Sequence, residues 1–264
     1  MSKWTETIPL DAGRRDLNGP LRGARNSTML EVLGNPRANY SDECQDTTNP
    51  DISKLIVREN VGPFKAKGLK PAVETLRIIM TEVKSDFPEI YSLLGNMGMM
   101  CCRFVRGSKS SISNHSWGTA IDLTINGILD KRGDGKAQRG LLEIYPIFNK
   151  HQFYWGAAFP TEDAMHFEAS EQLIREWHRS GLLNGSTNIT HDSIVEFGDR
   201  GSEVVEVQRR LAMTISGEIE ADGIFGAMTR ASVMEFQRRN GIQIDGIVGE
   251  ETLALLRKLS PSVT

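Results

Sequence analysis

The sequence predicts an α+β domain, built from a small antiparallel sheet with helices, followed by a small all-α domain of three helices. Residues 1–181 combine stretches of helical periodicity with short apolar or alternating segments that are typical of strands. Residues 194–264 show helical periodicity only, around a repeated glycine turn. The polar segment 182–193 has the composition of a linker. A chain of 264 residues is long enough for two separate cores.

The composition excludes several classes of protein. Hydrophobic residues make up 39% and charged residues 25% of the chain, which is ordinary for a globular protein and unlike a disordered or fibrous one. The formal charge is −3, so we expect no nucleic-acid partner. No run of about 18 apolar residues occurs, so we expect no insertion into a membrane.

The N-terminus and the cysteines indicate where the chain is made. The first residues lack the order of a secretory signal, in which basic residues precede an apolar run. We therefore expect synthesis in a host cytoplasm without a signal peptide. Cys44, Cys101 and Cys102 are too few and too unevenly spaced for a disulfide framework. We expect them to be reduced, with Cys101 and Cys102 buried as small hydrophobic residues.

The first third of the chain is predicted to contain loops and then helices. The first sixty or so residues are rich in Asn, Asp, Gly and Pro, which predicts mostly loop. One short helix is expected there, between a cap at Asn26–Ser27 and a stop at Gly34. From Pro71 onward apolar residues recur at helical spacing, which predicts a helix. A second helix is expected from Pro88 to Gly95.

Short segments that follow are expected to form the sheet. They are Phe104–Val105, Ala120–Ile125, Phe153–Trp155 and Met165–Glu168. A turn at Gly118 precedes the second of them. The segment Glu171–Ser180 has helical periodicity and is followed by Gly181, so it predicts the last helix of this domain.

An internal repeat organises the second domain. The frame D-G-I, an apolar residue, then G-x-x-T occurs at 222–229 and again at 245–252. Each copy predicts a glycine turn that leads into a helix. The apolar residues at helical spacing around these turns are Val204, Val207, Leu211, Val233, Phe236, Leu253 and Leu256. Three such amphipathic helices can close a small bundle.

Two segments carry the residue types that bind a catalytic metal. SNHSWGTAID contains His115 and Asp122, and EDAMHFE contains His166. Neutral imidazole and carboxylate suit zinc, and a catalytic zinc has three protein ligands. Asp163, three residues before His166, is placed to accept a proton from water that such a metal activates. Spacing alone leaves a second interpretation open, in which the histidine belongs to a turn and the aspartate is a cap.

These segments resemble the LAS metallopeptidases. The matching pattern is S-x-H-x-x-G-x-A-x-D, then W-G, then D-x-M-H-F-E. The family includes VanY-like D-alanyl-D-alanine carboxypeptidases and the L-alanyl-D-glutamate endolysins of phages. The resemblance implies one zinc ion per chain, bound by His115, Asp122 and His166, with Asp163 as the catalytic carboxylate. Many relatives have glutamate at that place, so Glu162 remains an alternative.

The resemblance also implies an arginine upstream of the ligand motif, where a fixed cation stabilises the oxyanion that forms on the scissile carbonyl group. Arg103 and Arg106 both fit this place, and Arg103 is preferred because Arg106 stands next to a glycine. We expect Ser113, Trp155 and Arg106 to contact the substrate. A turn role for Ser113 and a core position for Trp155 are the alternatives.

Other histidines and acidic residues are not expected to bind metal. His151, His178 and His191 have no partner motif. The segment DKRGDG at 130–135 has a faint likeness to a calcium loop, but Arg132 stands where an acceptor is needed. This segment therefore predicts a surface turn.

The C-terminal repeat resembles the three-helix type of peptidoglycan-binding domain, from about residue 194 to 259. The positions in register include both D-G-I copies and the pairs Val207–Gln208 and Phe236–Gln237. This second resemblance implies peptidoglycan as the partner. Because the two resemblances are independent and name the same polymer, they predict a zinc peptidase that degrades peptidoglycan by cleaving its stem peptide.

The expected setting is a phage or prophage endolysin, released by a holin and acting as a monomer in the periplasm or cell wall. Lysis requires cutting a bond that carries load, so we expect an endopeptidase that cleaves between L-Ala and D-Glu. The alternatives are a D-alanyl-D-alanine carboxypeptidase, a wall-degrading toxin delivered by a secretion machine, and a non-catalytic wall-binding protein. The complete set of His115, Asp122, His166 and Asp163 argues against the last of these.

Overall fold

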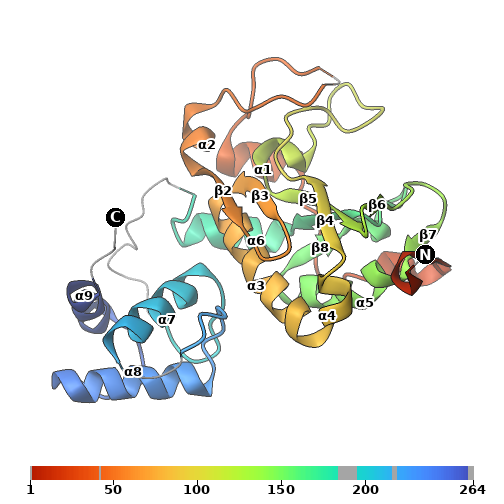
Figure 1. The fold of residues 1–264 in the computed structure, drawn as a ribbon. Coiled ribbons are helices and arrows are strands. Elements are labelled where there is room, and N and C mark those ends of the chain that lie inside the picture. The colour runs from red at the N-terminus through yellow and green to blue at the C-terminus, as the bar shows by residue number, and fades with distance from the viewer. Residues whose placement is uncertain (1, 42, 184–194, 216–218, 261–264) are drawn as a thin grey trace. The chain divides into compact units, whose positions relative to one another are not determined.

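The computed structural model describes residues 2–41, 43–183, 195–215 and 219–260. The chain divides into two compact units, 1–186 and 187–264 (Figure 1). The first unit contains small antiparallel sheets with helices, and the second is helical, which confirms the predicted fold class. The linker predicted at 182–193 lies mostly outside the described residues. Of the helices that the structure describes, none is long and apolar enough to span a membrane.

An antiparallel sheet forms the centre of the first unit. Within the described residues its strands follow the order β4, β5, β9, β8, and β6 pairs with β5. The bounds are Leu94–Gly98 for β4, Ala120–Ile125 for β5, Ile128–Leu129 for β6, Phe153–Trp155 for β8 and His166–Ala169 for β9. β5 and β8 coincide with predicted strands, and β9 begins one residue later than predicted.

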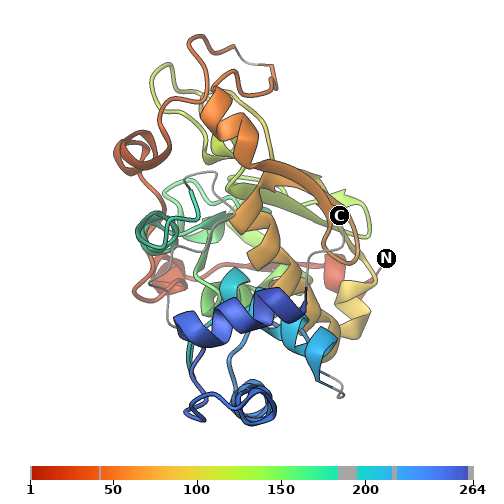
Figure 2. The ribbon, with the colours of Figure 1, turned by 90° about the vertical axis from the view of Figure 1, so that its left-hand side faces the viewer.

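Smaller pairs of strands lie beside this sheet. β2 (Ile56–Asn60) pairs with β3 (Lys65–Leu69), and β1 (Thr7–Pro9) pairs with β7 (Lys136–Gln138), both antiparallel. Because α2 (Pro50–Leu55) ends where β2 begins, the chain passes directly from helix to strand (Figure 2, in orange). The prediction of loop before residue 60 missed β1, α2 and β2.

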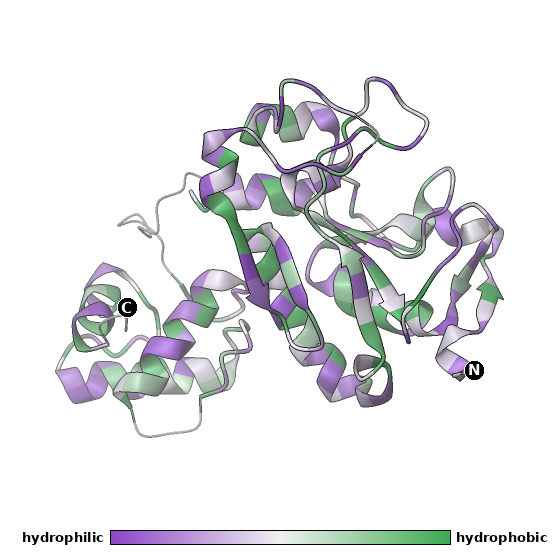
Figure 3. Ribbon diagram, turned by 45° about the horizontal axis from the view of Figure 1, so that its top comes forward, coloured by the Kyte–Doolittle hydropathy of each residue, from purple (hydrophilic) through white to green (hydrophobic). Residues whose placement is uncertain are grey.

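The helices of the first unit partly follow the prediction. Their bounds are Asn26–Leu33 for α1, Lys70–Asp86 for α3, Pro88–Tyr91 for α4, Arg139–Lys150 for α5 and Glu171–Arg179 for α6. α1, α3 and α6 confirm predicted helices, whereas α5 was not predicted. Hydrophobic and hydrophilic residues alternate along the helices (Figure 3), as amphipathic helices require.

Two predicted elements are wrong. The helix expected from Pro88 to Gly95 ends at Tyr91, and Leu94 begins β4, where it pairs with Ile125 of β5. Pairing within the sheet therefore outweighs the helical spacing of the local sequence. In place of the strand predicted at 104–105, the structure has an isolated bridge between Phe104 and Ile112.

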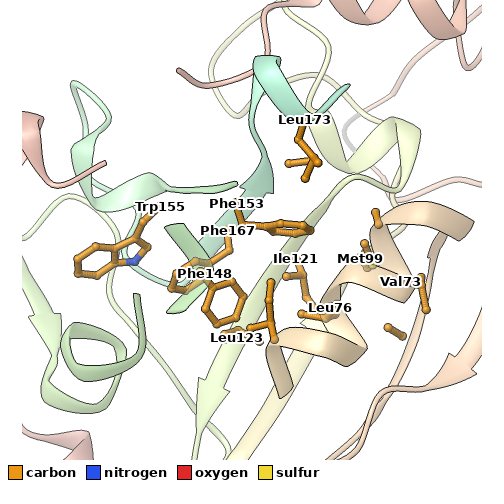
Figure 4. Packing of buried hydrophobic residues seen from close by; sticks show 14 of the residues in the cluster. Val73, Leu76, Met99, Ile121, Leu123, Phe148, Phe153, Trp155, Phe167 and Leu173 are labelled. Atoms are coloured by element: carbon orange, nitrogen blue, oxygen red, sulfur yellow. The ribbon is translucent and has the colours of Figure 1, made fainter. Parts of the chain in front are cut away.

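The core of the first unit lies between the central sheet and the helices α3 and α5. Figure 4 shows Leu76 of α3 and Phe148 of α5 among Ile121, Leu123 and Phe167 of the sheet, and all five are fully buried. Burying one such side chain stabilises the fold by about 1.5–3 kcal/mol. Since neighbouring side chains of a strand point to opposite faces, the burial of Ile121 and Leu123 turns the residue between them away from this core.

In the described part of the second unit, three helices enclose a separate core. They are α7 (Ser202–Thr214), α8 (Ala227–Asn240) and α9 (Glu250–Leu259). In Figure 2, α8 is seen end on, whereas α7 and α9 lie across the view. The seven apolar residues predicted to form this core are all buried. Phe225 and Val248, which belong to the repeated turns, are buried with them.

The polar residues of the repeat bind one another in two matching networks. Gln208 Nε2 donates hydrogen bonds to Asp222 Oδ1 at 2.7 Å and Thr229 Oγ1 at 3.0 Å. Gln237 Nε2 does the same with Asp245 Oδ1 at 2.8 Å and Thr252 Oγ1 at 3.2 Å. Each glutamine also accepts a hydrogen bond from the glycine N–H of its D-G-I turn, at 2.8 and 2.9 Å. The repeated residues therefore hold each turn on the helix that precedes it.

Candidate metal centre

His115 is held by a tight turn that precedes β5. It lies in the 3-10 turn Asn114–Trp117, which ends at Gly118 with a φ of 67°. A Cβ at Gly118 would lie 2.7 Å from the Leu69 nitrogen, so this turn requires glycine. The His115 side chain is buried, and its Nδ1 lies 3.1 Å from the Met99 carbonyl oxygen. Because Nδ1 donates to that carbonyl group, the lone pair of Nε2 is free to bind a metal.

Asp122 and His166 meet His115 from neighbouring strands. They are paired in register between β5 and β9. His115 Nε2, Asp122 Oδ1 and His166 Nδ1 lie 3.2 Å apart in each of their three pairs. Tetrahedral zinc, with bonds of about 2.0 Å, places its ligand atoms about 3.3 Å apart. The structure thus brings together the three residues that the sequence predicts as ligands, and their spacing fits one zinc ion.

The charge around these three atoms also suits a cation. Burial raises the pKa of Asp122, but in the metal-free protein the contacts of its carboxylate with the His115 and His166 rings outweigh burial and hold this pKa below its ordinary value. Burial lowers the pKa of His166, but Asp122 and Glu168 outweigh it and raise this pKa to about 10. Two carboxylates therefore favour positive charge at this point, which a divalent ion would supply.

Glu168 orients His166 from the side away from the ligand atoms. Its Oε2 accepts hydrogen bonds from His166 Nε2 and Asn114 Nδ2, both at 2.9 Å, and its Oε1 accepts one from the Ala24 N–H at 3.1 Å. A carboxylate behind a metal-binding histidine fixes its tautomer. Glu168 is absent from the predicted site, although side chains two apart in a strand share one face and this spacing could have indicated it.

Asp163 lies beside the three ligands, in the turn before β9. The His166 N–H donates to the Asp163 carbonyl oxygen at 3.0 Å. The Asp163 side chain is 21% exposed, and Arg132 Nε lies 3.3 Å from its Oδ2. Its Oδ1 is buried and has no hydrogen-bond partner among the described residues. Burial raises the pKa of this carboxyl group above its ordinary value, toward the range in which a general base works best.

The W-G pair of the motif is explained by packing. Trp155 is fully buried, stacks on Tyr145 with ring centroids 4.6 Å apart, and donates Nε1 to the Ala164 carbonyl oxygen at 2.7 Å. A Cβ at Gly156 would lie 2.6 Å from the Asp163 carbonyl oxygen, so glycine lets the turn approach. The prediction that Trp155 contacts the substrate is wrong, because this ring fills the core and supports the turn that carries Asp163.

A cleft of about 1180 Å³ contains the three ligand residues together with Asp163. Arg103, Arg106 and Ser113 line it as well. Arg103 is half-buried and donates Nη1 to the Phe104 carbonyl oxygen at 3.0 Å. Its pKa is lowered by burial and by the charge of Arg106. Two of the three predicted substrate-contacting residues, Ser113 and Arg106, thus lie at the cleft.

Glu162, the alternative carboxylate, faces a different neighbour. It is buried, and its Oε1 accepts a hydrogen bond from the Asp134 N–H at 2.6 Å. It is not among the residues that line the cleft. Asp163 therefore fits the role of the base better than Glu162 does.

The remaining histidines lie apart from this centre. His151 is buried and its Nε2 lies 2.8 Å from Glu82 Oε2, and His178 is exposed. His191 falls outside the described residues. Among the residues that the structure describes, one group could hold a metal ion, namely His115, Asp122 and His166. Their ligand atoms all lie within 4.8 Å of one another.

Two family models match the chain. Residues 106–169 match the family described as D-alanyl-D-alanine carboxypeptidase, and residues 200–256 match the family described as a peptidoglycan binding domain. Each match covers less than half of the chain, and the chain is similar to each family over those residues. The carboxypeptidase-family match contains all three ligand residues and Asp163, whereas Arg103 lies just before it.

Relatives and solved structures match shorter parts of the chain. A spore cortex-lytic enzyme of Halalkalibacterium halodurans is 37% identical over 67 residues, which are 25% of this chain and 20% of that protein. A spore cortex-lytic enzyme of Bacillus cereus is 31% identical over 67 residues, 25% of this chain and 26% of that protein. The crystal structure of a Burkholderia AP3 phage endolysin is 34% identical over 26% of this chain and 27% of that chain, with a TM-score of 0.25. The chain spans about a fifth to a quarter of the length of these curated relatives.

The cysteines of the first unit correct a prediction. Cys44 and Cys101 form a disulfide, and Cys102 is a buried free thiol. The sequence led us to expect all three to be reduced, because the 57 residues between Cys44 and Cys101 hide their proximity. The Cys101 N–H also donates to the His115 carbonyl oxygen at 2.9 Å, so this disulfide anchors a loop beside a ligand residue.

Proposed function

We propose that this chain is a zinc-dependent peptidase that cleaves the stem peptides of peptidoglycan. The observation that carries the proposal is the equal 3.2 Å spacing of His115 Nε2, Asp122 Oδ1 and His166 Nδ1, in a cleft that also holds the Asp163 carboxylate. Zinc at these atoms would supply a Lewis acid that activates water and polarises a carbonyl group. The match to the D-alanyl-D-alanine carboxypeptidase family supports a peptide of the cell wall as substrate.

The residues of the chain then take distinct roles. Asp163 accepts a proton from the attacking water and hands it to the amine that leaves, and its raised pKa suits both steps. Arg103 is a half-buried cation on the same cleft and stabilises negative charge on the carbonyl oxygen. Glu168 keeps His166 in the tautomer whose Nδ1 is free.

The peptidoglycan-binding unit raises the local concentration of substrate. It has its own core and its own hydrogen-bond networks, so it can hold the wall without taking part in the chemistry. Tethering of this kind increases the rate on an insoluble polymer and leaves the rate on a small soluble peptide unchanged.

For the bond that is cut, we favour L-Ala–D-Glu, cleaved by an endopeptidase that works as an endolysin. Lysis requires that the mesh be disconnected, and removal of a terminal D-Ala leaves it connected. The lytic names of the relatives that match a quarter of the chain support this choice. Release by a holin and a monomeric state belong to the same proposal.

A D-alanyl-D-alanine carboxypeptidase is the second candidate. The description of the family matched at residues 106–169 favours it directly. The two candidates differ in the part of the stem that must enter the cleft, since a carboxypeptidase takes the free C-terminal end and an endopeptidase takes an internal bond.

Digestion of purified sacculi, followed by mass spectrometry of the soluble products, tests the proposal. We expect fragments with a new N-terminal D-Glu from the wild-type protein and none from His115→Ala. Free D-Ala without a new D-Glu N-terminus would establish the second candidate. Equal products from wild-type protein and His115→Ala would contradict the metal-dependent peptidase itself.

A further inference from the structure

Arg132 is a charged residue of the cleft to which the proposed function assigns no role. The sequence predicts a surface turn at 130–135, yet Arg132 lines the same cleft as the three ligand residues. Its Nε lies 3.3 Å from Asp163 Oδ2. We propose that Arg132 binds the free α-carboxylate of the substrate residue that follows the scissile bond. This inference rests on the proposed function and adds a determinant of specificity to it.

The turn that carries Arg132 is fastened to the segment that carries Asp163. The Gly133 N–H donates to the Glu162 carbonyl oxygen at 3.1 Å, and the Asp134 N–H donates to Glu162 Oε1 at 2.6 Å. At the start of the turn, the buried Asp130 accepts a hydrogen bond from the Gln138 N–H at 2.6 Å. Because Glu162 directly precedes Asp163, the backbone of Arg132 keeps a fixed place beside the base. A group held in this way loses little freedom when a ligand binds.

The guanidinium group of Arg132 keeps donors for a ligand. Its side chain is 32% exposed, and its buried Nε faces Asp163 Oδ2 at 3.3 Å. Its two Nη groups form no hydrogen bond among the described residues, so they are the donors that remain for a ligand. Arg25 is different, because its Nε and Nη2 already bind both oxygens of Glu171, at 2.8 and 2.7 Å. A guanidinium group has five N–H donors in a plane that matches the two oxygens of a carboxylate. Arg132 can thus bind a second carboxylate in addition to Asp163.

The position of Arg132 follows the chemistry of peptide cleavage. Since Asp163 hands its proton to the leaving nitrogen, that nitrogen must come within hydrogen-bond distance of the Asp163 carboxylate. In the residue after the scissile bond, a single carbon atom separates this nitrogen from the α-carboxylate. Arg132 contacts the Asp163 carboxylate, so it lies where that α-carboxylate arrives. Arg103 remains the cation for the carbonyl oxygen on the other side of the bond.

Both candidate bonds present this carboxylate. D-Glu continues the stem through its side-chain carboxyl group, which leaves its α-carboxylate free, and the terminal D-Ala has a free α-carboxylate as well. The substrate class is therefore a peptide whose residue after the scissile bond is a D-amino acid with a free α-carboxylate. Amidation of that group removes the charge and one acceptor oxygen, and should weaken recognition.

Two soluble stem peptides test this inference, identical except that the α-carboxylate after the scissile bond is free in one and amidated in the other. For the wild-type protein we expect kcat/KM to be about 10- to 100-fold higher for the free acid, the range of one charge-assisted hydrogen-bonded pair. In Arg132→Gln this preference should disappear. KM for the free acid should rise, while kcat and KM for the amide should change little. Arg132→Lys should retain part of it. In the Asp163→Asn background, calorimetry should show the same loss of free-acid binding when Arg132→Gln is added.

The control is Lys131→Gln, which removes the same charge from an exposed neighbour in the same turn that does not line the cleft. It should keep the full preference for the free acid. An equal fall for both peptides in Arg132→Gln would show that Arg132 only positions Asp163, and would overturn the inference. So would a preference that survives in Arg132→Gln. Failure of the wild-type protein to cleave either peptide would refute the proposed function instead.

Discussion

The two candidate metal-binding histidines each have a fixed partner on the nitrogen that faces away from the metal. His115 uses the Met99 carbonyl oxygen, and His166 uses the Glu168 carboxylate. These partners decide which ring nitrogen carries the proton, and so they leave one lone pair on each ring free to bind zinc. We expect the carboxylate partner to strengthen zinc binding more than the carbonyl partner does, because the carboxylate adds negative charge behind the ring.

We therefore predict that Glu168→Ala weakens zinc binding about 10- to 100-fold. The ring of His166 would lose the acceptor that holds its tautomer, and Asn114 and the Ala24 N–H would lose theirs. Competition with a chelating dye measures the affinity directly. Glu143→Ala, at an exposed position of α5, should leave it unchanged. Equal affinity in Glu168→Ala and wild-type protein would contradict this role.

At the residue scale, local sequence predicts the ligands better than their surroundings. The sequence could predict the ligands His115, Asp122 and His166 because the family motif contains them in two short segments. Arg132 could not, because its contact with Asp163 depends on a turn folding back across 31 positions of the chain. The sequence leaves Trp155 open between cleft and core, because an aromatic ring suits both, and its complete burial in the structure decides for the core.

At the scale of elements, strand register sets the site. β5 buries Ile121 and Leu123 on one face and pairs Asp122 with His166 of β9. A slip of one residue would put Asp122 into the core and separate the ligands. The N-terminal segment reaches the same cleft, since Gly23 to Asn26 line it. That segment is held by the bidentate pair of Arg25 with Glu171 of α6.

We predict that this pair makes stability depend on pH in the acid range. Hydrogen bonds from Arg25 lower the pKa of Glu171 from 4.5 to about 2. The unfolded chain then binds more protons than the folded one between these values, so the stabilisation is complete above about pH 5 and is lost as the pH falls toward 2. Urea unfolding at several pH values gives the free energy of unfolding as a function of pH. Between about pH 2 and 5 this free energy should fall less steeply in Glu171→Gln than in the wild-type protein. An unchanged slope would show that the pair contributes nothing.

The repeated turns of the second unit make a prediction that separates structure from binding. Gln237 is buried and links Asp245, Gly246 and Thr252. Gln237→Ala removes these hydrogen bonds and leaves the Gly246 N–H without its acceptor, and we expect the unit to lose about 1–3 kcal/mol of unfolding free energy. Thermal unfolding measures the loss. Gln243→Ala, at an exposed position nearby, should change little, and equal stability of the two variants would contradict the role of the network.

The helices could be predicted from sequence more readily than the strands. α3 carries apolar residues at helical spacing over 17 residues and α6 over nine. β4 has five residues and begins at Leu94, inside a segment that also suits a helix. What makes Leu94 a strand residue is its pairing with Ile125, 31 positions away. Long-range pairing of this kind leaves no trace in local periodicity.

For the whole molecule, the separate cores of the two units predict separable activities. A truncated protein that ends at Leu183 should cleave a small soluble muropeptide at the rate of the full chain. It should also lose most of its activity on whole sacculi, because it lacks the tether. Co-sedimentation with purified sacculi measures the tether itself. Equal sedimentation of truncated and full-length protein would place wall affinity in the first unit.

The central claim is that His115, Asp122 and His166 bind one zinc ion that the peptidase activity requires. Titration of zinc into metal-free protein, with hydrolysis of a soluble stem peptide as the signal, tests it most directly. We predict no hydrolysis without metal, and activity that rises in proportion to zinc and levels off at one equivalent per chain. Asp122→Ala should stay inactive over the same titration. Hydrolysis by the metal-free protein, or by Asp122→Ala at the wild-type rate, would contradict the claim.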